Sequence, residues 1–364
     1  MRRRTFLVGA AGTATALSGC TGNGNGNGNG NGNGNGNGNG ETTPTTEDPT
    51  ITIATYDSFV DGSDPVGPWL KEEFEAEYDA TLEFRTPDAG INQYILRAQQ
   101  DADIDADIFV GLNVDELIRI DEQLDVPLFD SLDGDVERSD RILDELRVDP
   151  EGRAVPYDTG YISLVYDERS VEPETFEDLT APETEDELLT QNAQQSDPGL
   201  AFLLWTIHEY GPEGYLDYWS ELRDNGVQVL GSWTDAYNAY TEAQERDIVV
   251  SYSTDQVFNG DVPRHQIGFL NDQGYAQPEG MARFMDTPNP DAAKDLMEFM
   301  LRADVQGVIA EKNVQFPAVD DAELAEEFAE LAHVPPEPVT FGYDELAGNL
   351  DEWVEDWARQ MNVG

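Results

Sequence analysis

The sequence predicts an α/β protein whose folded part forms two lobes with a ligand cleft between them. From residue 50 onward, short runs rich in β-branched residues alternate with longer segments of helical periodicity. This alternation favours sheets that are covered by helices on both faces. The folded region is also too long to be built around a single small core. Because ligands bind between domains and at the carboxyl ends of strands, we expect the binding site in the cleft.

The expected strands are short and are bounded by turn residues; they span residues 51–56, 80–85, 106–111, 154–156, 160–166, 227–230 and 248–252. Two of the expected helices begin with a capping residue followed by proline, at Asp197-Pro198 and Asn289-Pro290. The expected helices span residues 68–78, 91–100, 115–121, 198–210, 234–245, 290–301 and 351–361.

The element order divides the folded region into three segments. Residues 50–156 form the expected lobe 1 and residues 157–274 form lobe 2, while residues 275–364 return to lobe 1 with C-terminal helices. In the last helix Trp353, Trp357 and Met361 recur at a spacing of four residues. Because this spacing places them on one face, we expect the stripe to pack the helix onto a lobe.

Residues 1–20 have the features of an export signal. Adjacent arginines stand before Phe6-Leu7, as in a twin-arginine signal, and the apolar stretch after them is too short to span a bilayer. The signal ends in Leu17-Ser18-Gly19-Cys20, which is typical of a lipobox whose cysteine becomes lipidated. We therefore expect the protein to be anchored by lipid at the extracellular face of the cell membrane.

Residues 21–49 contain nine consecutive Asn-Gly repeats, followed by Thr, Pro and acidic residues. A segment with so few apolar side chains cannot bury a core, so we expect it to be disordered. Its predicted role is that of a tether between the lipid anchor and the folded region.

The chain carries 75 acidic and 20 basic residues, a formal charge of −55. Such a charge repels itself in dilute buffer, whereas in about 1 M salt the Debye length falls to roughly 3 Å. The composition therefore predicts a halophilic protein. It also argues against nucleic-acid binding, which requires a basic surface.

The motifs of common enzymes are missing from the sequence. The three histidines, His208, His265 and His333, are far apart and lack the spacing of metal ligands. There is no nucleophile elbow and no phosphate-binding glycine loop with lysine. We therefore expect no enzymatic activity, no cofactor and no metal, although a catalytic carboxylate pair could be hidden among so many acidic residues.

A series of segments resembles, in order, the periplasmic thiamine-binding proteins of ABC importers. The segments are Tyr56-Asp57-Ser58-Phe59, Val110-Gly111-Leu112-Asn113, Pro156-Tyr157-Asp158-Thr159-Gly160-Tyr161, Ser196-Asp197-Pro198-Gly199-Leu200, Ser232-Trp233-Thr234-Asp235-Ala236-Tyr237, Val250-Ser251-Tyr252-Ser253-Thr254, and Gln277 with Glu279. The resemblance implies a two-lobed periplasmic-binding-protein (type II) fold. It also implies a monomeric solute-binding lipoprotein that delivers thiamine or its phosphates to a permease and an ATPase.

The same resemblance implies a set of ligand-binding residues. Thiamine is flat, aromatic and permanently cationic, so its site needs aromatic faces and polar groups. The implied set consists of the aromatic residues Tyr56, Trp233, Tyr237, Tyr252 and Phe258, and the polar residues Asp57, Asn113, Ser196 and Asp197.

Five positions in or beside this set differ in what the sequence implies for them. Ser196 and Asp197 stand at a helix start, which could bind phosphate or serve only as a cap. The family has aspartate at the position of Asn113 and tryptophan at the position of Val314. Trp233 is the aromatic residue that we most expect to face the ligand.

Several alternatives remain open at this stage. The same fold could bind ferric iron or a polyamine, although the Tyr-Tyr pair that is typical of iron receptors is absent. The protein could also be a sensory receptor, or a hydrolase with an unrecognised site.

The lipobox leads to a prediction about processing. Mature protein extracted from membranes should lack residues 1–19 and carry a lipid on Cys20, as intact-mass analysis can show. Cys20→Ser should release the protein or leave the signal uncut. A Cys20→Ser variant that is still processed and bound to the membrane would place the anchor elsewhere.

The net charge leads to a prediction about salt. The melting temperature of the purified protein should rise steadily from low salt to about 1 M salt, because screening weakens the repulsion between carboxylates. Thermal melts across a series of salt concentrations measure this effect. A melting temperature that does not change with salt would contradict the prediction.

Overall fold

A single mixed sheet organises the part of the chain that the computed structural model describes, residues 48–132 and 134–363. These residues belong to one unit by their contacts. The main path of the sheet runs β2-β1-β3-β9-β4-β7-β5-β6, while β8 and β10 pair with β4 and β11 pairs with β9. The predicted signal at residues 1–20, and the predicted tether up to residue 47, lie outside the described residues.

The strands fall into two parallel groups joined by antiparallel strands. β1 pairs in parallel with β2 and β3, and β5 pairs in parallel with β6 and β7. The strands are β1 (Thr50–Ala54), β2 (Thr81–Arg85), β3 (Ile108–Leu112), β4 (Val155–Tyr166), β5 (Leu188–Gln191), β6 (Gln228–Leu230), β7 (Ile248–Tyr252), β8 (Gln266–Gly268), β9 (Gln273–Arg283), β10 (Phe316–Pro317) and β11 (Glu337–Val339).

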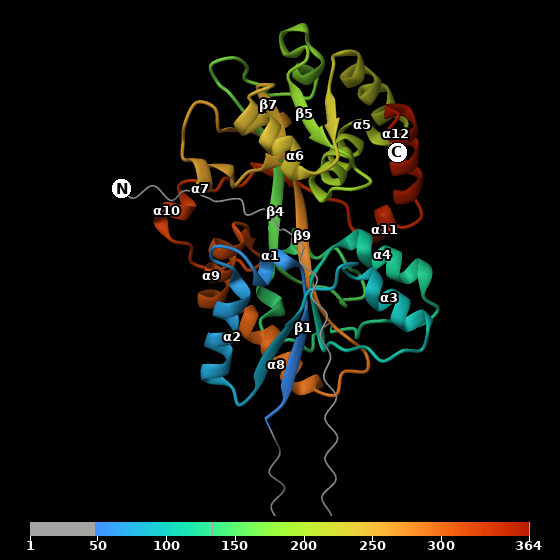
Figure 1. Ribbon diagram of the computed structural model, residues 1–364, viewed down its shortest axis with the longest axis vertical. Helices are drawn as coiled ribbons and strands as arrows, with labels where there is room; N and C mark the ends of the chain where they lie inside the picture. The colour runs from blue at the N-terminus through green and yellow to red at the C-terminus, as the bar shows by residue number, and fades with distance from the viewer. Residues whose placement is uncertain (1–47, 133, 364) are drawn as a thin grey trace, which may run out of the picture. The chain divides into compact units, whose positions relative to one another are not determined.

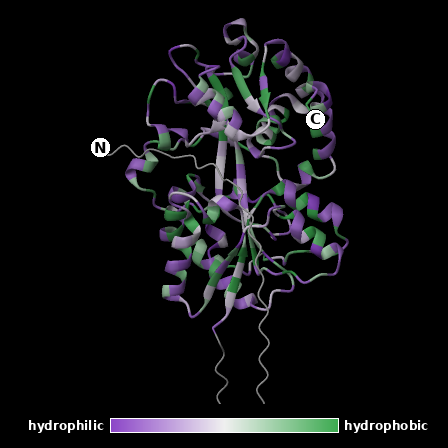
Figure 2. Ribbon diagram, viewed as in Figure 1, coloured by the Kyte–Doolittle hydropathy of each residue, from purple (hydrophilic) through white to green (hydrophobic). Residues whose placement is uncertain are grey.

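β4 and β9 are the two longest strands, and they pass side by side from one half of this unit to the other (Figure 1). At one end β9 pairs with β3, and at the other end β4 pairs with β7. Figure 2 shows the middle of both strands in pale and purple shades, between green strands above and below. The two halves are thus connected by a polar stretch of sheet.

The helices cover the sheet in both halves. They are α1 (Asp57–Val60), α2 (Val66–Glu77), α3 (Asn92–Gln99), α4 (Val114–Gln123), α5 (Asp197–Asp224), α6 (Trp233–Asn238), α7 (Asp255–Asn259), α8 (Pro290–Met300), α9 (Ala303–Asn313), α10 (Glu326–Ala329), α11 (Tyr343–Leu346) and α12 (Leu350–Met361). α5 is interrupted at Gly211, whose φ is 73°, directly before Pro212. A π-helical turn, Ala239–Ala243, follows α6.

Most predicted elements are found within a few residues of their expected bounds, but one strand boundary is wrong. The sequence predicts separate strands at residues 154–156 and 160–166, bounded by turn residues. The structure has one continuous strand there, in which Tyr157, Asp158 and Thr159 are fully buried. Asp158 and Thr159 pair with β9 on one side and β10 on the other, and the carbonyl of Tyr157 accepts from Gln306 Nε2 at 2.8 Å.

In the half that contains β1, the sheet has a hydrophobic core on each face. Ile51 and Ile53 contact the core formed with α2 and α8, whereas Ala54 contacts the core formed with α3 and α4. Ile108 and Phe109 of β3 divide between the two cores in the same way. This alternation follows from the two-residue period of a strand.

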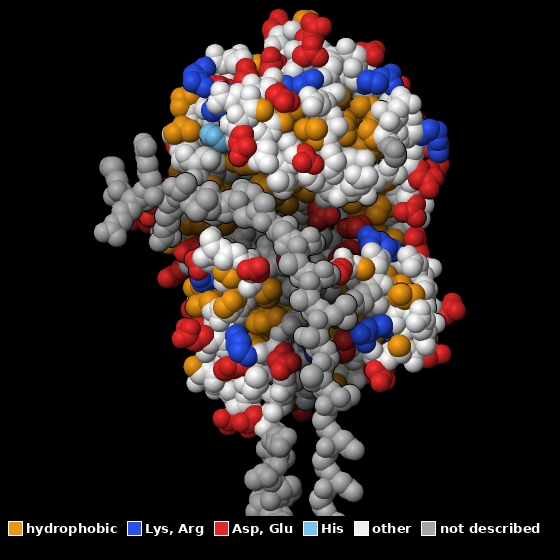
Figure 3. Space-filling model, viewed as in Figure 1, with side chains coloured by type: hydrophobic (Ala, Val, Ile, Leu, Met, Phe, Trp, Pro, Cys, Tyr) orange, Lys and Arg blue, Asp and Glu red, His pale blue; other side chains and the backbone are white. Residues whose placement is uncertain are grey.

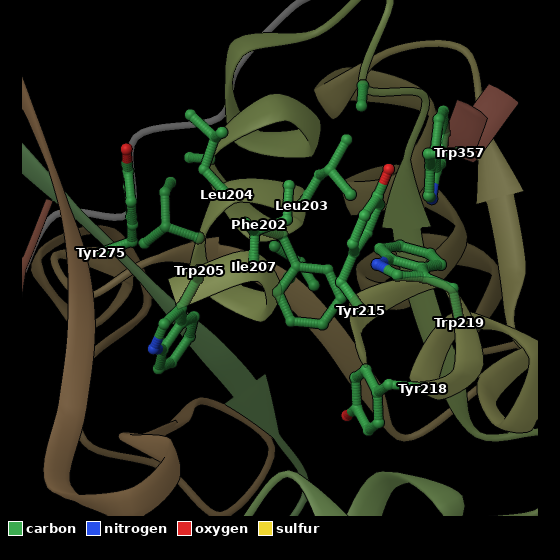
Figure 4. Close-up of a cluster of buried hydrophobic side chains, with 14 of the residues drawn as sticks. Phe202, Leu203, Leu204, Trp205, Ile207, Tyr215, Tyr218, Trp219, Tyr275 and Trp357 are labelled. Carbon is green, nitrogen blue, oxygen red and sulfur yellow. The ribbon is translucent and has the colours of Figure 1, made fainter. Parts of the chain in front are cut away.

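In the other half, the main core is built on α5. Phe202, Trp205 and Trp219 are fully buried there (Figure 4). α12 packs against α5, and Trp357 contacts Trp219 edge to face with ring centroids 5.3 Å apart. The predicted packing stripe is therefore confirmed, and the helix that it anchors is α12. The domain boundaries at residues 156 and 274 stay a prediction.

Within residues 48–132 and 134–363, no helix has the length and hydrophobicity that crossing a bilayer requires.

The burial of Trp357 leads to a stability prediction. Trp357→Ala should lower the free energy of unfolding by about 3–5 kcal/mol, because it leaves a cavity between α5 and α12. Chemical denaturation measures the loss. Trp353→Ala, at a partly buried position on the same helix, should cost clearly less. Equal losses in the two variants would contradict the packing described here.

Candidate ligand-binding cavity

A cavity of about 530 Å³ lies where elements of both halves meet beside β4 and β9. The ends of β1, β3 and β7 contribute to it, as do the start of α5 and the segment after α9. Its lining residues are Thr55, Tyr56, Asp57, Ser58, Pro87, Asp88, Gly90, Phe109, Gly111, Asn113, Glu116, Asp197, Tyr252, Glu279, Asn313 and Gln315. The cavity is therefore at the carboxyl ends of strands, as we expected from the fold class.

Two glycines allow aromatic rings to form walls of the cavity. A Cβ atom on Gly111 would lie 2.6 Å from the ring of Tyr56, and the φ of Gly111 is 96°. A Cβ atom on Gly160 would lie 2.9 Å from the ring of Tyr252. Any larger residue at these positions would displace the rings, so Gly111 and Gly160 fix the positions of the two tyrosines.

A chain of hydrogen bonds runs beneath the cavity. The Asn313 Nδ2 group donates to Tyr56 Oη at 2.8 Å and to Asp158 Oδ2 at 2.7 Å. Tyr56 Oη lies 3.1 Å from Tyr157 Oη, and Tyr157 Oη donates to Glu279 Oε2 at 2.7 Å. These five residues thus form a continuous polar network from α9 to β9.

Burial alters the acid–base properties of this network. It raises the pKa values of Tyr56 and Tyr157 well above their usual range, so both phenols stay protonated. Burial also raises the pKa of Glu279, while the hydrogen bond from Tyr157 lowers it. The pKa of Asp158 is raised well above its usual range, first by burial and then by the charge of Glu279.

A second cavity of about 610 Å³ adjoins the first, and Glu116 and Asp197 line both. Its walls come from α4, the start of α5 and α12, and its only basic lining residue is Arg119. Arg119 forms an ion pair with Asp115 at 3.1 Å. Burial, followed by the charge of Asp197, raises the pKa of Asp115. Acidic groups therefore outnumber basic ones in both cavities, while burial raises the pKa of Glu116, which both share, to about 8.

Five of the predicted site residues line the first cavity: Tyr56, Asp57, Asn113, Asp197 and Tyr252. Ser196 lines the second cavity instead, because it precedes the first turn of α5. Asn113 precedes α4, where its backbone N–H donates to the side chain of Glu116. The structure thus brings together predicted residues from four separate segments of the chain.

Trp233, Tyr237 and Phe258 do not line either cavity. Trp233 stacks on Tyr237 with ring centroids 4.7 Å apart, and its Nε1 group donates to Ser251 Oγ at 3.1 Å. The hydroxyl of Tyr237 donates to Asp255. Phe258 is 69% exposed. Their role in ligand binding stays a prediction, and it requires a movement that brings them to the cavity.

The charges of the lining residues decide what the first cavity can bind. Asp57, Asp88, Glu116, Asp197 and Glu279 line it, and none of its lining residues is a lysine or an arginine. Among the described residues, no group of three His, Cys, Asp or Glu side chains could hold a metal ion. Carboxylates beside aromatic faces without metal geometry suit an organic cation.

Comparison with known proteins places the chain in a family. A family model described as bacterial extracellular solute-binding protein matches residues 102–336. The chain belongs to this family. Among its relatives is the thiamine-binding periplasmic protein of Escherichia coli (strain K12), which is 27% identical over 330 residues, or 88% of this chain and 96% of the relative. The thiamine-binding periplasmic protein of Brucella suis is 28% identical over 321 residues, or 85% of this chain and 91% of the relative.

Solved structures confirm the fold of this solute-binding protein. A periplasmic thiamin binding protein has a TM-score of 0.70 at 24% identity, and the match covers 87% of this chain and 97% of that one. A ferric binding protein from Campylobacter jejuni has a TM-score of 0.68 at 18% identity, covering 85% and 99%. The expected two-lobed periplasmic-binding fold, with a cleft between the lobes, is therefore confirmed.

The sequence did not assign site roles to Tyr157, Asp158, Glu279, Asn313 or Gln315. Asp158 and Glu279 were present in segments that resemble the family, but nothing in the sequence showed that they lie side by side. Their pairing depends on the register of β4 against β9, which aligns Asp158 with Glu279. Gln315 lines the cavity one residue after Val314, which has a φ of 56°.

Proposed function

We propose that this solute-binding protein is the receptor of an ABC importer for thiamine, and that the 530 Å³ cavity is its ligand site. The observation that carries the proposal is the combination of tyrosine walls and carboxylates with no basic lining residue. Thiamine presents two flat aromatic rings and a permanent positive charge, which this combination complements. The similarity to relatives named thiamine-binding periplasmic proteins supports the same ligand.

The cavity chemistry separates thiamine from ferric iron, which a structural neighbour is named for binding. Ferric iron requires several oxygen or nitrogen ligands that converge on one point. The described residues contain no group of three His, Cys, Asp or Glu side chains with that geometry. Burial also raises the pKa values of Tyr56 and Tyr157 well above their usual range, which disfavours the phenolate form that binds iron. A polyamine would share the need for carboxylates and aromatic faces, so binding measurements must separate it from thiamine.

The phosphorylation state of the ligand depends on the start of α5. Backbone N–H groups at a helix start favour an anion, but Pro198 has no N–H, Gly199 is buried, and the carboxylate of Asp197 stands at the same position. Arg119 of the second cavity attracts that carboxylate but is already paired with Asp115, and no lining residue of the first cavity is basic. We therefore expect unphosphorylated thiamine to bind more tightly than its monophosphate or diphosphate.

The remaining parts of the proposal concern the cellular setting. We propose that the protein is a monomer, without enzymatic activity, held by the lipid on Cys20 at the extracellular face of the membrane. The segment at residues 21–49 connects the lipid anchor to the folded region. The partners of the protein are a permease and an ATPase. The acidic surface (Figure 3) suits a medium of high salt.

Calorimetric titration in about 1 M salt tests the ligand. Thiamine should bind, and thiamine phosphates should bind more weakly. Tyr252→Ala should weaken thiamine binding about tenfold, because it removes an aromatic wall beside a cation. Trp233→Ala should weaken binding about ten- to a hundredfold if lobe closure brings this ring to the ligand.

Tyr210→Ala is the matched control, because Tyr210 stacks on Tyr218 and lines neither cavity. It should leave the affinity unchanged. Binding of spermidine or ferric citrate, with every form of thiamine inert, would contradict the proposed ligand. If thiamine binds and Trp233→Ala has no effect, the sequence-based role of Trp233 is wrong.

A further inference from the structure

Asp158 and Glu279 are direct cross-strand neighbours beneath the cavity. The antiparallel register of β4 and β9 aligns their Cα atoms. Residues opposite each other in an antiparallel pair have Cβ atoms about 4.5–5.5 Å apart, on the same face of the sheet. Two negative charges at this separation repel each other, and they do so more strongly in a buried site. The pair therefore favours a state with a single negative charge.

The polarity of the hydrogen-bond chain shows which carboxyl group holds that charge. The hydroxyl of Tyr157 donates to Glu279, so Tyr157 can accept from Tyr56. Tyr56 in turn accepts from Asn313, which leaves its own proton for Tyr157. Both tyrosine hydroxyls of this hydrogen-bond network thus donate in the direction of Glu279. This arrangement stabilises a carboxylate at Glu279.

Asp158 is in the opposite situation. Its side chain is 0% exposed, and among the described residues its Oδ1 atom has no hydrogen-bond partner. Only the neutral amide of Asn313 donates to its Oδ2 atom. Lys312, which precedes Asn313 in α9, does not compensate Asp158, because it forms an ion pair with Asp64 at 2.6 Å. An ionised Asp158 would therefore be a poorly compensated charge, which favours its protonated form.

The other groups that face Asp158 do not compensate a charge there. Glu279 faces it from β9, Tyr157 lies beside it on β4, and Tyr56 comes from the segment after β1. The charge of Asp158 also reaches Tyr252 at the end of β7. None of these groups is cationic. Burial and the charge of Glu279 raise the pKa of Asp158, in agreement with this geometry.

We propose that Asp158 and Glu279 form an adjustable counter-charge, in which a bound organic cation causes Asp158 to release its proton. In the free protein the pair carries one negative charge, on Glu279. A cation in the adjoining cavity stabilises a second negative charge, so the Asp158 carboxylic acid becomes a carboxylate and its proton passes to the buffer. Specificity for a cation then rests on this pair as well as on the tyrosine walls. The inference rests on the proposed function of the same cavity.

The sign of the pH dependence follows from this proton release. The complex holds fewer protons than the free protein, so affinity rises with pH. This rise spans the pH range between the pKa of Asp158 in the complex and its higher pKa in the free protein. Within that range, release of one proton lowers Kd about tenfold per pH unit. Below it, Asp158 stays protonated in both states and the dependence disappears.

Calorimetry of the purified protein with thiamine tests the inference. Titrations at one pH in two buffers with different ionisation enthalpies count the protons released, and repeats from about pH 6 to about pH 8 give the change in Kd. We expect release of up to about one proton per bound thiamine. Asp158→Asn should lower the release and weaken the pH dependence. Glu116→Gln is measured beside it, because burial raises the pKa of Glu116, another acid of the cavity lining, to about 8. Asp217→Asn, at an exposed position of α5 outside both cavities, should leave the release unchanged.

The possible failures can be told apart. If thiamine does not bind at any pH, the proposed function fails. If thiamine binds to the unsubstituted protein and no proton is exchanged, the counter-charge inference fails while the proposed function stands. This result does not depend on whether the Asp158→Asn variant folds. If proton release is lost in the Glu116→Gln variant but kept in the Asp158→Asn variant, the proton comes from Glu116 of α4. That result would overturn the role of Asp158.

Discussion

The antiparallel register of β4 against β9 is the constraint on which the site depends. These strands connect the two halves of the sheet, and Glu279 in the polar middle of β9 lines the cavity. The register changes between Pro156 and Asp158, so Tyr157 is an extra residue on β4. This irregularity allows Tyr157 to reach Glu279 while Asp158 stands opposite it. A shift of one residue would turn each side chain to the other face.

The cavity differs from the rest of the protein in how its acids are compensated. Asp149 is buried, but Arg153 forms an ion pair with it at 3.1 Å. Asp167 is also buried and is paired with Arg169 and Arg264. Asp158 is equally buried, and no ion pair to it occurs among the described residues. Asp107 is also buried without an ion pair, but Thr52, Thr287 and Asn289 all donate to it. Within the part of the chain that the structure describes, Asp158 has a single side-chain donor and an unpartnered Oδ1 atom, which agrees with a ligand that supplies the positive charge.

The aromatic residues fall into two sets that are held in different ways. Tyr56 and Tyr252 pack against Gly111 and Gly160, so their positions are fixed by the sheet. Trp233 and Tyr237 are held against each other on α6 and are tied by hydrogen bonds to Ser251 and Asp255. The first set forms the cavity described here. The second set belongs to the other half and can join the site only if the halves approach each other.

The sequence by itself determined the alternation of strands and helices, the two-lobed fold class and the family, because these depend on local periodicity and on residue types in order. It also identified Tyr56, Asp57, Asn113, Asp197 and Tyr252, because they stand in segments that resemble the thiamine-binding family. It could not show that β4 is continuous, because burial of polar residues in a strand depends on a partner strand. β9 was not predicted at all. Only the tertiary structure decided that Asp158 lies opposite Glu279 and that Trp233 lies outside the cavity. Register and side-chain packing join residues that are far apart in the chain, and no local pattern records them.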